Sequence, residues 1–370
     1  WEKYLEVCHA QAAPERLFRL VSNAFEVGWL LEAIDPINQS LFCSMSVVCV
    51  RGHRIRLQYI GYKDCYDIWV NSDSPFIFPC GFCKRTGRQL LPPKEHDPKS
   101  FDWNNYVESN PNFSIAPEEV FASMPTSLSN LTKFEIKDKL EAIDRQNSEL
   151  ICVATVIDML GDVVLIHFDG WDSEYDYWTH ATSALIHPVG WCEENGRLLS
   201  PPQGYVGENF NWEQHLNETG FRAAPTQCFD CVPHEFVTGM KLEAVDPRNQ
   251  SLVRVASVSE VEEHRIKIHF DGWDSIYDEW FDVDSSDLHP VNWCQKTGHP
   301  LEPQLTVKDR DQNKGGCPTP GCNGVGHVKS SKFQHNHRKH HSEYGCPYAP
   351  KNLGKAVLYD RLAHRAPRKY

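Results

Sequence analysis

Aromatic rings and carboxylates recur together at fixed spacing in this chain. The stretch HFDGWDSEYDYW at residues 167–178 returns as HFDGWDSIYDEW at 269–280, with ten of twelve letters unchanged. In the first copy Phe168, Trp171 and Tyr175 span the end of a predicted strand and an Asp-Gly turn. Their rings can therefore leave the strand and surround one small volume. Each ring face of this kind attracts a cation by roughly 0.5–2 kcal/mol.

A second recurring phrase supplies a carboxylate. It reads LEAIDPINQSL from Leu31, LEAIDRQNSEL from Leu140 and LEAVDPRNQSL from Leu242. Asp144 and Asn147 lie in a loop that a small barrel would bring to the same rim as the rings. A carboxylate that accepts a charge-assisted hydrogen bond adds about 1.5–3 kcal/mol. Rings and carboxylate together predict a receptor for a methylated ammonium group.

The carboxylate also predicts which methylation state binds. Mono- and dimethyllysine retain an N–H that can donate to it, whereas trimethyllysine has none and is wider. Unmodified lysine holds its water too tightly to gain much from the rings. Because a flexible tail loses entropy when it docks, we expect affinities between micromolar and millimolar.

Core packing is the structural alternative, because aromatic triplets in barrels usually fill the interior and Asp beside Pro or Arg usually forms a turn. The joint recurrence of Asp, Asn and three rings favours the cage instead. The candidate cage residues of the other copies are Asp35, Asn38, Tyr59, Tyr62 and Tyr66 in the first and Asp246, Asn249, Phe270, Trp273 and Tyr277 in the third. The residues predicted to be core are Trp69, Trp178, Trp280, His187 and His289.

The elements that position these residues also recur three times. A helix-like stretch begins at Trp1, Trp103 and Trp212, and each stretch precedes a β-rich run with turn signals such as Gly52 and Gly161. Such runs are typical of short antiparallel strands that close into small barrels. The sequence therefore predicts a mostly β chain with short helical arms. Its units are arm plus barrel at residues 1–100, 101–209 and 210–306, with a tail at 307–370.

Charge is distributed unevenly along the 370 residues. The net charge of −13 combines an acidic body of −22 with a tail of +9 from residue 307 onward. The body would repel phosphate and attract basic partners, whereas the tail could do the opposite. No window approaches a membrane-spanning length, and the first residues lack a secretory signal. We therefore expect a soluble, intracellular protein whose 14 cysteines are reduced and which has no membrane partner.

The basic tail carries a metal-binding pattern. Cys317 and Cys322 are separated by four residues, His327 follows after another four, and a histidine-rich run precedes Cys346. Zn²⁺ favours tetrahedral thiolate and imidazole ligands, and a segment this short and polar would hardly fold without a metal. We therefore expect a structural Zn²⁺ site.

Catalysis is not expected from this sequence. Nothing resembles a nucleophile elbow or a phosphate-binding glycine loop. His167 and Asp169 imitate the His-x-Asp pair of iron oxygenases, but the first unit has Gln58 and Ile60 at these places. We therefore expect a binding protein and no enzyme.

The phrases KLEAVDPRNQSL, HFDGWDSIYDEW and LHPVNWCQKTGHPL resemble the malignant brain tumour (MBT) repeat proteins, specifically the lethal(3)malignant brain tumour-like group with three repeats and a following zinc finger. The resemblance covers residues 1 to about 362. It implies a three-bladed propeller whose arms pack on neighbouring barrels. It also implies a nuclear protein that compacts chromatin or represses transcription by binding lower-methylated histone lysines.

The same resemblance implies that the second repeat carries the working pocket. Its residues would be Asp144, Asn147, Phe168, Trp171 and Tyr175, with Cys152 lining it. In the related Cys-Cys-His-Cys fingers five residues separate the last His from the last Cys. That count selects Cys317, Cys322, His340 and Cys346 as zinc ligands, with His335 as a rival and His327 as a rival or a supporting residue.

The other two pockets differ from the second in charge. Lys63 beside the first cage would oppose a cationic guest, and Arg254 replaces Cys152 in the third, where it would obstruct the pocket or neutralise its charge. We therefore rank the second repeat first, the third next and the first last. Two other functions stay open: a repressor-complex scaffold that binds proline-rich or other peptides, and a binder of DNA or nucleosomes through the basic tail.

Overall fold

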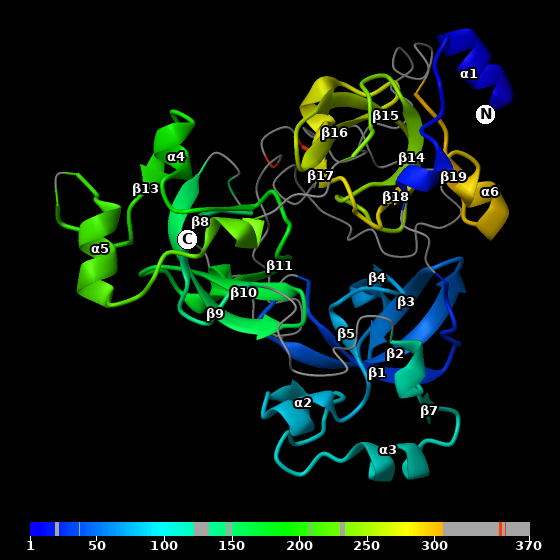
Figure 1. The fold of residues 1–370 in the computed structure, drawn as a ribbon. Helices are drawn as coiled ribbons and strands as arrows, with labels where there is room; N and C mark the ends of the chain where they lie inside the picture. Colours follow the sequence, from blue (N-terminus) through cyan, green and yellow to red (C-terminus); the bar gives the residue numbers. More distant parts are fainter. Residues whose placement is uncertain are drawn as a thin grey trace.

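The computed structural model describes residues 1–18, 22–36, 38–121, 133–145, 147, 150–207, 209–229, 234–305, 348–349 and 352. Three curled β-sheets dominate them and appear in Figure 1 as blue, green and yellow-green lobes, with short helices between and beside them. The chain is therefore mostly β, as the sequence predicts. We call the sheets the first, second and third half-barrels.

Each half-barrel repeats one topology, in which four antiparallel strands form a meander-like core and a fifth pairs beside the first. In the first half-barrel the order is β4-β3-β2-β1-β5, and β6 and β7 add short parallel pairings. The strands of the first half-barrel are β1 (Trp29–Ile34), β2 (Phe42–Arg51), β3 (Arg54–Tyr59), β4 (Ile68–Asn71), β5 (Ile77–Phe78), β6 (Leu90–Leu91) and β7 (Ser114–Ile115).

The second and third half-barrels follow the orders β11-β10-β9-β8-β12 and β17-β16-β15-β14-β18. The second consists of β8 (Lys139–Ile143), β9 (Ile151–Leu160), β10 (Val163–Phe168), β11 (Tyr177–His180), β12 (Ile186–His187) and β13 (Leu199–Ser200). The third consists of β14 (Lys241–Val245), β15 (Val253–Val261), β16 (Arg265–Phe270), β17 (Glu279–Asp282), β18 (Leu288–His289) and β19 (Leu301–Glu302).

A register shift in the longest hairpin of every half-barrel curls the sheet. The shift falls between Val47 and Cys49 in β2 and between Val258 and Glu260 in β15, with an equivalent shift between Leu165 and Ile166 in β10. A bulge of this kind adds local twist and bends the strand. The three sheets are therefore bent at equivalent places.

The helical arms lie on a half-barrel other than the one that follows them in sequence. They contain α1 (Glu2–Cys8) with η1 (Glu15–Leu17), α3 (Trp103–Ser109) with η3 (Glu118–Val120), and α5 (Trp212–Thr219) with η5 (Thr226–Phe229). Trp103 donates its indole N–H to Glu32 at 2.8 Å, and Trp212 donates to Glu141 at 2.8 Å. Trp1 donates to Glu243 of the third half-barrel at 2.7 Å, so the first arm packs on the last sheet (Figure 1).

The recurring glutamates hold a second element as well. Glu141 is fully buried and accepts the backbone N–H groups of Gly190 and Cys192, both at 2.8 Å. Glu32 and Glu243 make the equivalent bonds, so each carboxylate fixes the start of the short helix that follows the fifth strand. These helices are α2 (Phe82–Thr86), α4 (Trp191–Glu194) and α6 (Trp293–Thr297). The recurring phrase that begins at Leu31, Leu140 and Leu242 is therefore partly structural.

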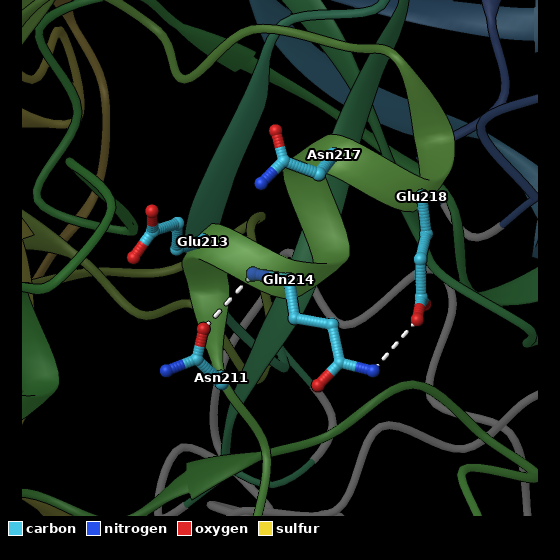
Figure 2. A pocket seen from close by; sticks show the side chains of 5 residues that line it. All are labelled: Asn211, Glu213, Gln214, Asn217 and Glu218. Atoms are coloured by element: carbon cyan, nitrogen blue, oxygen red, sulfur yellow. Dashed lines mark hydrogen bonds between the residues drawn. The ribbon is translucent and has the colours of Figure 1, made fainter.

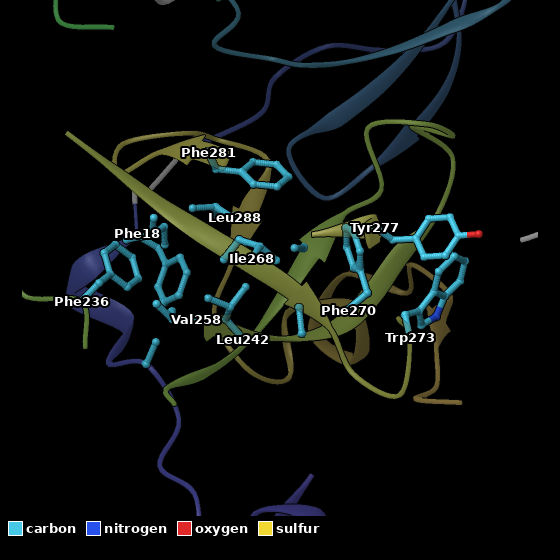
Figure 3. Packing of buried hydrophobic residues seen from close by; sticks show 14 of the residues in the cluster. Phe18, Phe236, Leu242, Val258, Ile268, Phe270, Trp273, Tyr277, Phe281 and Leu288 are labelled. Carbon is cyan, nitrogen blue, oxygen red and sulfur yellow. The ribbon is translucent and has the colours of Figure 1, made fainter. Parts of the chain in front are cut away.

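Apolar side chains fill the inside of each half-barrel. In the third, Phe18 from the first arm packs edge-on against Phe236, with ring centroids 5.7 Å apart. Figure 3 shows these two rings at one end of the cluster and Trp273 and Tyr277 at the other. One continuous core thus connects the arm to the candidate pocket.

The residues predicted to be core are buried to different degrees. Trp178 is buried, whereas Trp69 and Trp280 are half-buried. His187 and His289 stack on the tryptophans at the start of α4 and α6, with ring centroids 3.8 Å apart in both pairs. Burial lowers the pKa of His187 to about 4, so this imidazole is neutral near pH 7.

Hydrogen bonds join the half-barrels in every pairing. Trp178 donates its backbone N–H to the Gln39 side chain at 2.6 Å, and Ser183 donates to Asp282 at 3.1 Å. The Asn71 amide donates to Ser286 at 3.0 Å. The three-bladed propeller itself stays a prediction. None of the helices in the described ranges is long and apolar enough to cross a bilayer.

Candidate functional site

The three rings of the second repeat come from a strand end, a turn and a single helical turn. β10 ends at Phe168, and Gly170 follows with φ 81°; a Cβ there would lie 2.7 Å from the backbone oxygen of Gln203. The 3-10 helix η4 (Ser173–Tyr175) then directs Tyr175 back toward Trp171. Only glycine fits this turn.

The rings lie close enough to line one volume. The centroids of Phe168 and Trp171 are 6.1 Å apart at 56°, and those of Trp171 and Tyr175 are 5.1 Å apart at 77°. Phe168 is 1% exposed, whereas Trp171 and Tyr175 are half-buried. The arrangement therefore has one buried ring and two rings that solvent reaches.

Asp144 follows the end of β8, where Ala142 and Ile143 pair with Cys152 and Ile151 of β9. It is buried, and its backbone N–H closes the loop by donating to the Leu150 carbonyl at 3.0 Å. Cys152 on β9 belongs to the same buried cluster as Phe168. Burial first, and then the negative charge of Asp144, raises the pKa of the Cys152 thiol to about 11. The sheet thus brings together the carboxylate, the thiol and the rings predicted to share a site.

The recurring asparagines serve the loop that carries the aspartate. The backbone N–H of Asn147, an exposed residue, donates to the Asp144 carbonyl at 3.1 Å. In the first and third repeats the side-chain oxygens of Asn38 and Asn249 accept a serine hydroxyl at 2.7 Å within the same loop. Asparagine therefore stabilises the turn in these two repeats, which is a common role for this side chain.

The first repeat has three tyrosines in the predicted positions, and one of them bonds the aspartate. The Tyr59 hydroxyl donates to Asp35 at 3.0 Å, and both side chains are buried. The rings of Tyr59, Tyr62 and Tyr66 follow one another at 6.3 and 6.4 Å. Lys94, which the sequence analysis did not single out, places its ammonium 5.9 Å from the Tyr62 centroid. Lys63 is exposed.

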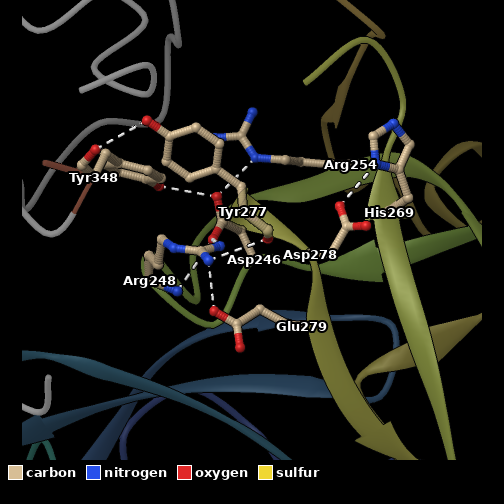
Figure 4. Close-up of polar contacts among 8 residues, drawn as sticks. All are labelled: Asp246, Arg248, Arg254, His269, Tyr277, Asp278, Glu279 and Tyr348. Carbon is tan, nitrogen blue, oxygen red and sulfur yellow. Dashed lines mark hydrogen bonds and ion pairs between the residues drawn. The ribbon is translucent and has the colours of Figure 1, made fainter. Parts of the chain in front are cut away.

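The third repeat contains its own positive charge and a ring from the tail. Arg254 is buried; its Nε donates to Asp246 at 2.7 Å, and its guanidinium lies 4.4 Å from the Trp273 centroid. Tyr348 donates its hydroxyl to the same carboxylate at 2.9 Å and places its ring 5.9 Å from Trp273. Figure 4 shows Arg254 and Tyr348 converging on Asp246. Sequence analysis missed Tyr348, because no local pattern links it to this repeat.

The three repeats place different residues, with different charges, at the same positions of the sheet. Phe270, Trp273 and Tyr277 of the third repeat are all buried, unlike their counterparts in the second. Arg254 aligns with Cys152 and Cys43, and Tyr59 aligns with Phe168 and Phe270. At the aligned positions of the second repeat, Cys152 and Phe168 carry neither a positive charge nor a hydroxyl.

The histidine and aspartates of the His-x-Asp stretch have separate partners. His167 Nδ1 lies 2.7 Å from Asp176, on the neighbouring strand connection. Asp169 instead pairs with the Lys139 ammonium and lies 3.0 Å from His215 Nε2 in the third arm. His167 and Asp169 therefore serve structural contacts of the sheet and the arm. Within the described ranges no group of three His, Cys, Asp or Glu side chains could hold a metal ion.

Two surface hollows lie away from the rings. One, of about 460 Å³, follows helix α5 and is lined only by polar side chains of that helix and its cap, as Figure 2 shows. The Gln214 amide donates to Glu218 there at 2.7 Å. The other, of about 340 Å³, lies between the second and third repeats and includes His187, Glu263 and His264. Neither hollow contains a predicted cage residue.

The predicted zinc ligands lie outside the described residues. They are Cys317, Cys322, His340 and Cys346, together with His327 and His335.

Comparisons with known proteins agree with this architecture. The family described as mbt repeat matches residues 29–97, 138–206 and 240–308, and the zinc finger of C2HC type matches 316–349. Lethal(3)malignant brain tumor-like protein 1 of Gallus gallus is 46% identical over 96% of this chain and 45% of its own length. Lethal(3)malignant brain tumor-like protein 4 of Homo sapiens is 44% identical over 98% of this chain and 59% of its own length. The chain thus spans about half the length of these relatives.

A solved structure has the same fold. It is the crystal structure of the four MBT repeats of Drosophila melanogaster Sfmbt in complex with the peptide RHR(me)KVLR, with a TM-score of 0.58 and 32% identity over 77% of this chain and 68% of that chain. The matched repeats begin near the first strand of every half-barrel and take up more than half of the chain. This chain therefore belongs to the MBT repeat family, with three repeats followed by a C2HC zinc finger.

Proposed function

We propose that this chain is a reader of mono- and dimethyllysine and that the second repeat holds the modified side chain. One observation carries the proposal: the half-buried rings of Trp171 and Tyr175 pack in sequence with the buried ring of Phe168, in a cluster that includes Cys152. The strand of Cys152 pairs with the strand that ends just before the buried Asp144. The aligned carboxylates of the other repeats accept hydrogen bonds from Tyr59 or Arg254, side chains that the second repeat replaces with Phe168 and Cys152.

The chemistry of the pocket follows from these groups. A methylated ammonium carries a diffuse positive charge and sheds water readily, so ring faces attract it by roughly 0.5–2 kcal/mol each. An N–H of mono- or dimethyllysine can donate to Asp144, whereas trimethyllysine would lose this bond and add width. Because Phe168 closes the inner end, the pocket would take only the tip of the side chain. Flanking residues would then contribute little, which fits a reader with weak sequence preference.

The family and the solved neighbour support this function. The Sfmbt repeats, which share this fold, were crystallised with a peptide that carries a methylated lysine. For this chain we infer that the ligands are methylated histone tails on nucleosomes, and hence that the protein acts in the nucleus. Several repeats on one chain would let it bridge or compact nucleosomes and repress transcription together with repressor-complex proteins. The function is binding, without catalysis.

The tail adds a metal site to the proposal. Cys317, Cys322, His340 and Cys346 offer three thiolates and one imidazole, the donor set that Zn²⁺ takes in structural sites. The net charge of +9 from residue 307 onward favours weak, salt-sensitive contact with DNA.

Titration of histone-like peptides carrying un-, mono-, di- and trimethyllysine tests the reader. Mono- and dimethyl peptides should bind the chain, and Asp144→Asn should weaken them by about tenfold or more, because it removes a charged acceptor without changing the shape. Asp35→Asn is the matched control in the first repeat and should leave these affinities unchanged. Equal affinity for all four peptides, or full binding by Asp144→Asn, would contradict the proposal.

A further inference from the structure

The pocket of the third repeat has the rings and carboxylate of the second but a different occupant. We propose that it is a tyrosine-binding site, filled in this chain by Tyr348, and that it does not act as a second ammonium receptor. The proposal stands independently of the proposed methyllysine function.

The third pocket already contains two guanidinium groups. The guanidinium of Arg254 lies 4.4 Å from the Trp273 centroid, and its Nε donates to Asp246 at 2.7 Å. The ring face and the carboxylate that would attract an ammonium therefore already hold a cation. Arg248 adds a second guanidinium, 5.4 Å from the Tyr277 centroid and 3.9 Å from Asp246. A buried third positive charge would meet repulsion with little left to neutralise it.

The pocket holds the phenol of Tyr348 by a hydrogen bond and a ring contact. The Tyr348 side chain is fully buried, and its hydroxyl donates to Asp246 Oδ2 at 2.9 Å. Its ring is inclined at 47° to Trp273, with centroids 5.9 Å apart. Burial first, and then the charge of Asp246, raises the pKa of Tyr348 well above its ordinary value, so the phenol stays a hydrogen-bond donor. A phenylalanine would fill the space without satisfying the carboxylate.

The pocket also bonds the backbone of Tyr348. The Tyr277 hydroxyl donates to the Tyr348 carbonyl at 3.1 Å, so the pocket bonds both the side-chain tip and the main chain (Figure 4). Ala349 is 1% exposed and belongs to the same buried cluster, which leaves room for only a small side chain after the tyrosine. The ligand class is therefore a peptide with a Tyr-Ala step, here supplied by the chain itself.

Docking of Tyr348 also has a consequence for the zinc finger. Tyr348 follows Cys346, the last predicted zinc ligand, by two positions, and the family match to the C2HC finger ends at residue 349. Because a chain of two residues spans only a few ångströms, the filled pocket would tether the end of the finger to the third repeat.

The test uses the full chain with the pocket opened by Tyr348→Ala. The probe is a peptide with the sequence of residues 345–352, GCPYAPKN, titrated under reducing conditions. We expect the variant to bind this peptide between micromolar and millimolar, whereas the unaltered chain binds at least about tenfold more weakly because its pocket is filled. Phenylalanine in place of the peptide's tyrosine should weaken binding by about tenfold, since it loses the bond to a charged acceptor. Tyr359→Ala, which removes another tail tyrosine, should behave as the unaltered chain does.

Thermal unfolding of Tyr348→Ala shows whether the variant is folded. A folded variant that does not bind the peptide, or that binds it no better than the unaltered chain, overturns the proposal. So does a phenylalanine peptide that binds as tightly as the tyrosine peptide. A dimethyllysine peptide that gains a second site on Tyr348→Ala alone would overturn the charge argument, because Arg254 would then not exclude an ammonium.

Discussion

The second and third pockets share their rings and their aspartate but differ in the charges beside that aspartate. Both have an aspartate at the end of the first strand, Phe, Trp and Tyr at the same places, and a 3-10 turn that carries the tyrosine. The ring spacings agree closely: the Trp-Tyr centroids are 5.1 Å apart in the second and 5.3 Å apart in the third. The aligned differences include Cys152 against Arg254 and Gln146 against Arg248, together with the tail tyrosine.

The ligand that an aromatic cage accepts therefore depends on the charges in the cage as well as on its rings. In the third repeat a guanidinium takes the place that we assign to a methylated ammonium in the second. Once the carboxylate is neutralised, the remaining space suits a neutral donor such as a phenol. A family member can therefore keep every ring of a cage and still recognise a different ligand.

The largest expected effect is the loss of stability in Trp273→Ala compared with Trp171→Ala. Trp273 is 5% exposed and packs with Arg254 and Tyr348, so Trp273→Ala should lower the free energy of unfolding by about 3–5 kcal/mol. Trp171 is half-buried, so Trp171→Ala should cost less than half as much stability but should remove most dimethyllysine binding. Chemical denaturation measures the stability of both variants, and peptide titration measures their dimethyllysine binding. Loss of dimethyllysine binding only in Trp273→Ala would reverse the assignment of the pockets.

Replacing Cys152 with the arginine found in the third repeat should make the second pocket resemble the third in charge. Cys152→Arg would place a guanidinium beside Asp144, and dimethyllysine affinity should fall at least about thirtyfold, because the carboxylate and a ring face are both engaged. Ile157→Arg on the exposed part of the same strand is the matched control and should leave binding unchanged. Calorimetric titration distinguishes the two variants. An unchanged affinity in a folded Cys152→Arg chain would mean that charge does not separate these pockets.

The reverse exchange should create a weak new site. Arg254→Cys combined with Tyr348→Ala removes both occupants of the third pocket, so the number of dimethyllysine peptides bound per chain should rise from one to two. The new affinity should stay in the micromolar to millimolar range typical of such a small contact. Tyr348→Ala alone is the control and should keep one site. A stoichiometry of one in the double variant would show that other residues close the pocket.

The proximity of the three rings in each repeat could be predicted because the rings are close together in the sequence. Phe168, Trp171 and Tyr175 lie within one strand end and one turn, so their spacing alone brings the rings together. The core of each half-barrel follows for the same reason, since its first four strands each pair with the next strand in the chain. The predicted Asp144 approaches this group because β8 and β9 pair side by side.

Contacts between distant segments could not be predicted in this way. Tyr348 lies 71 residues after Tyr277, in a tail with no repeated counterpart, so nothing in the local pattern links it to the third pocket. The recurrence of Glu243 is visible in the sequence, but its bond to Trp1 spans 242 residues and depends on how the first arm packs. Lys94 near Tyr62 likewise comes from beyond the strands that form its pocket.

The smallest effect should come from Cys152→Ser, and it isolates charge from size in the comparison with Arg254. Burial, together with the charge of Asp144, raises the pKa of the Cys152 thiol to about 11, so the thiol is protonated and neutral at lower pH. Serine is also neutral and of similar size. Cys152→Ser should therefore change the dimethyllysine affinity by less than about threefold at any pH between 6 and 9. Peptide titration at several pH values checks this for both chains. If Cys152→Ser weakened binding as much as Cys152→Arg, the packing of the sulfur, rather than the missing positive charge, would be what distinguishes the second pocket from the third.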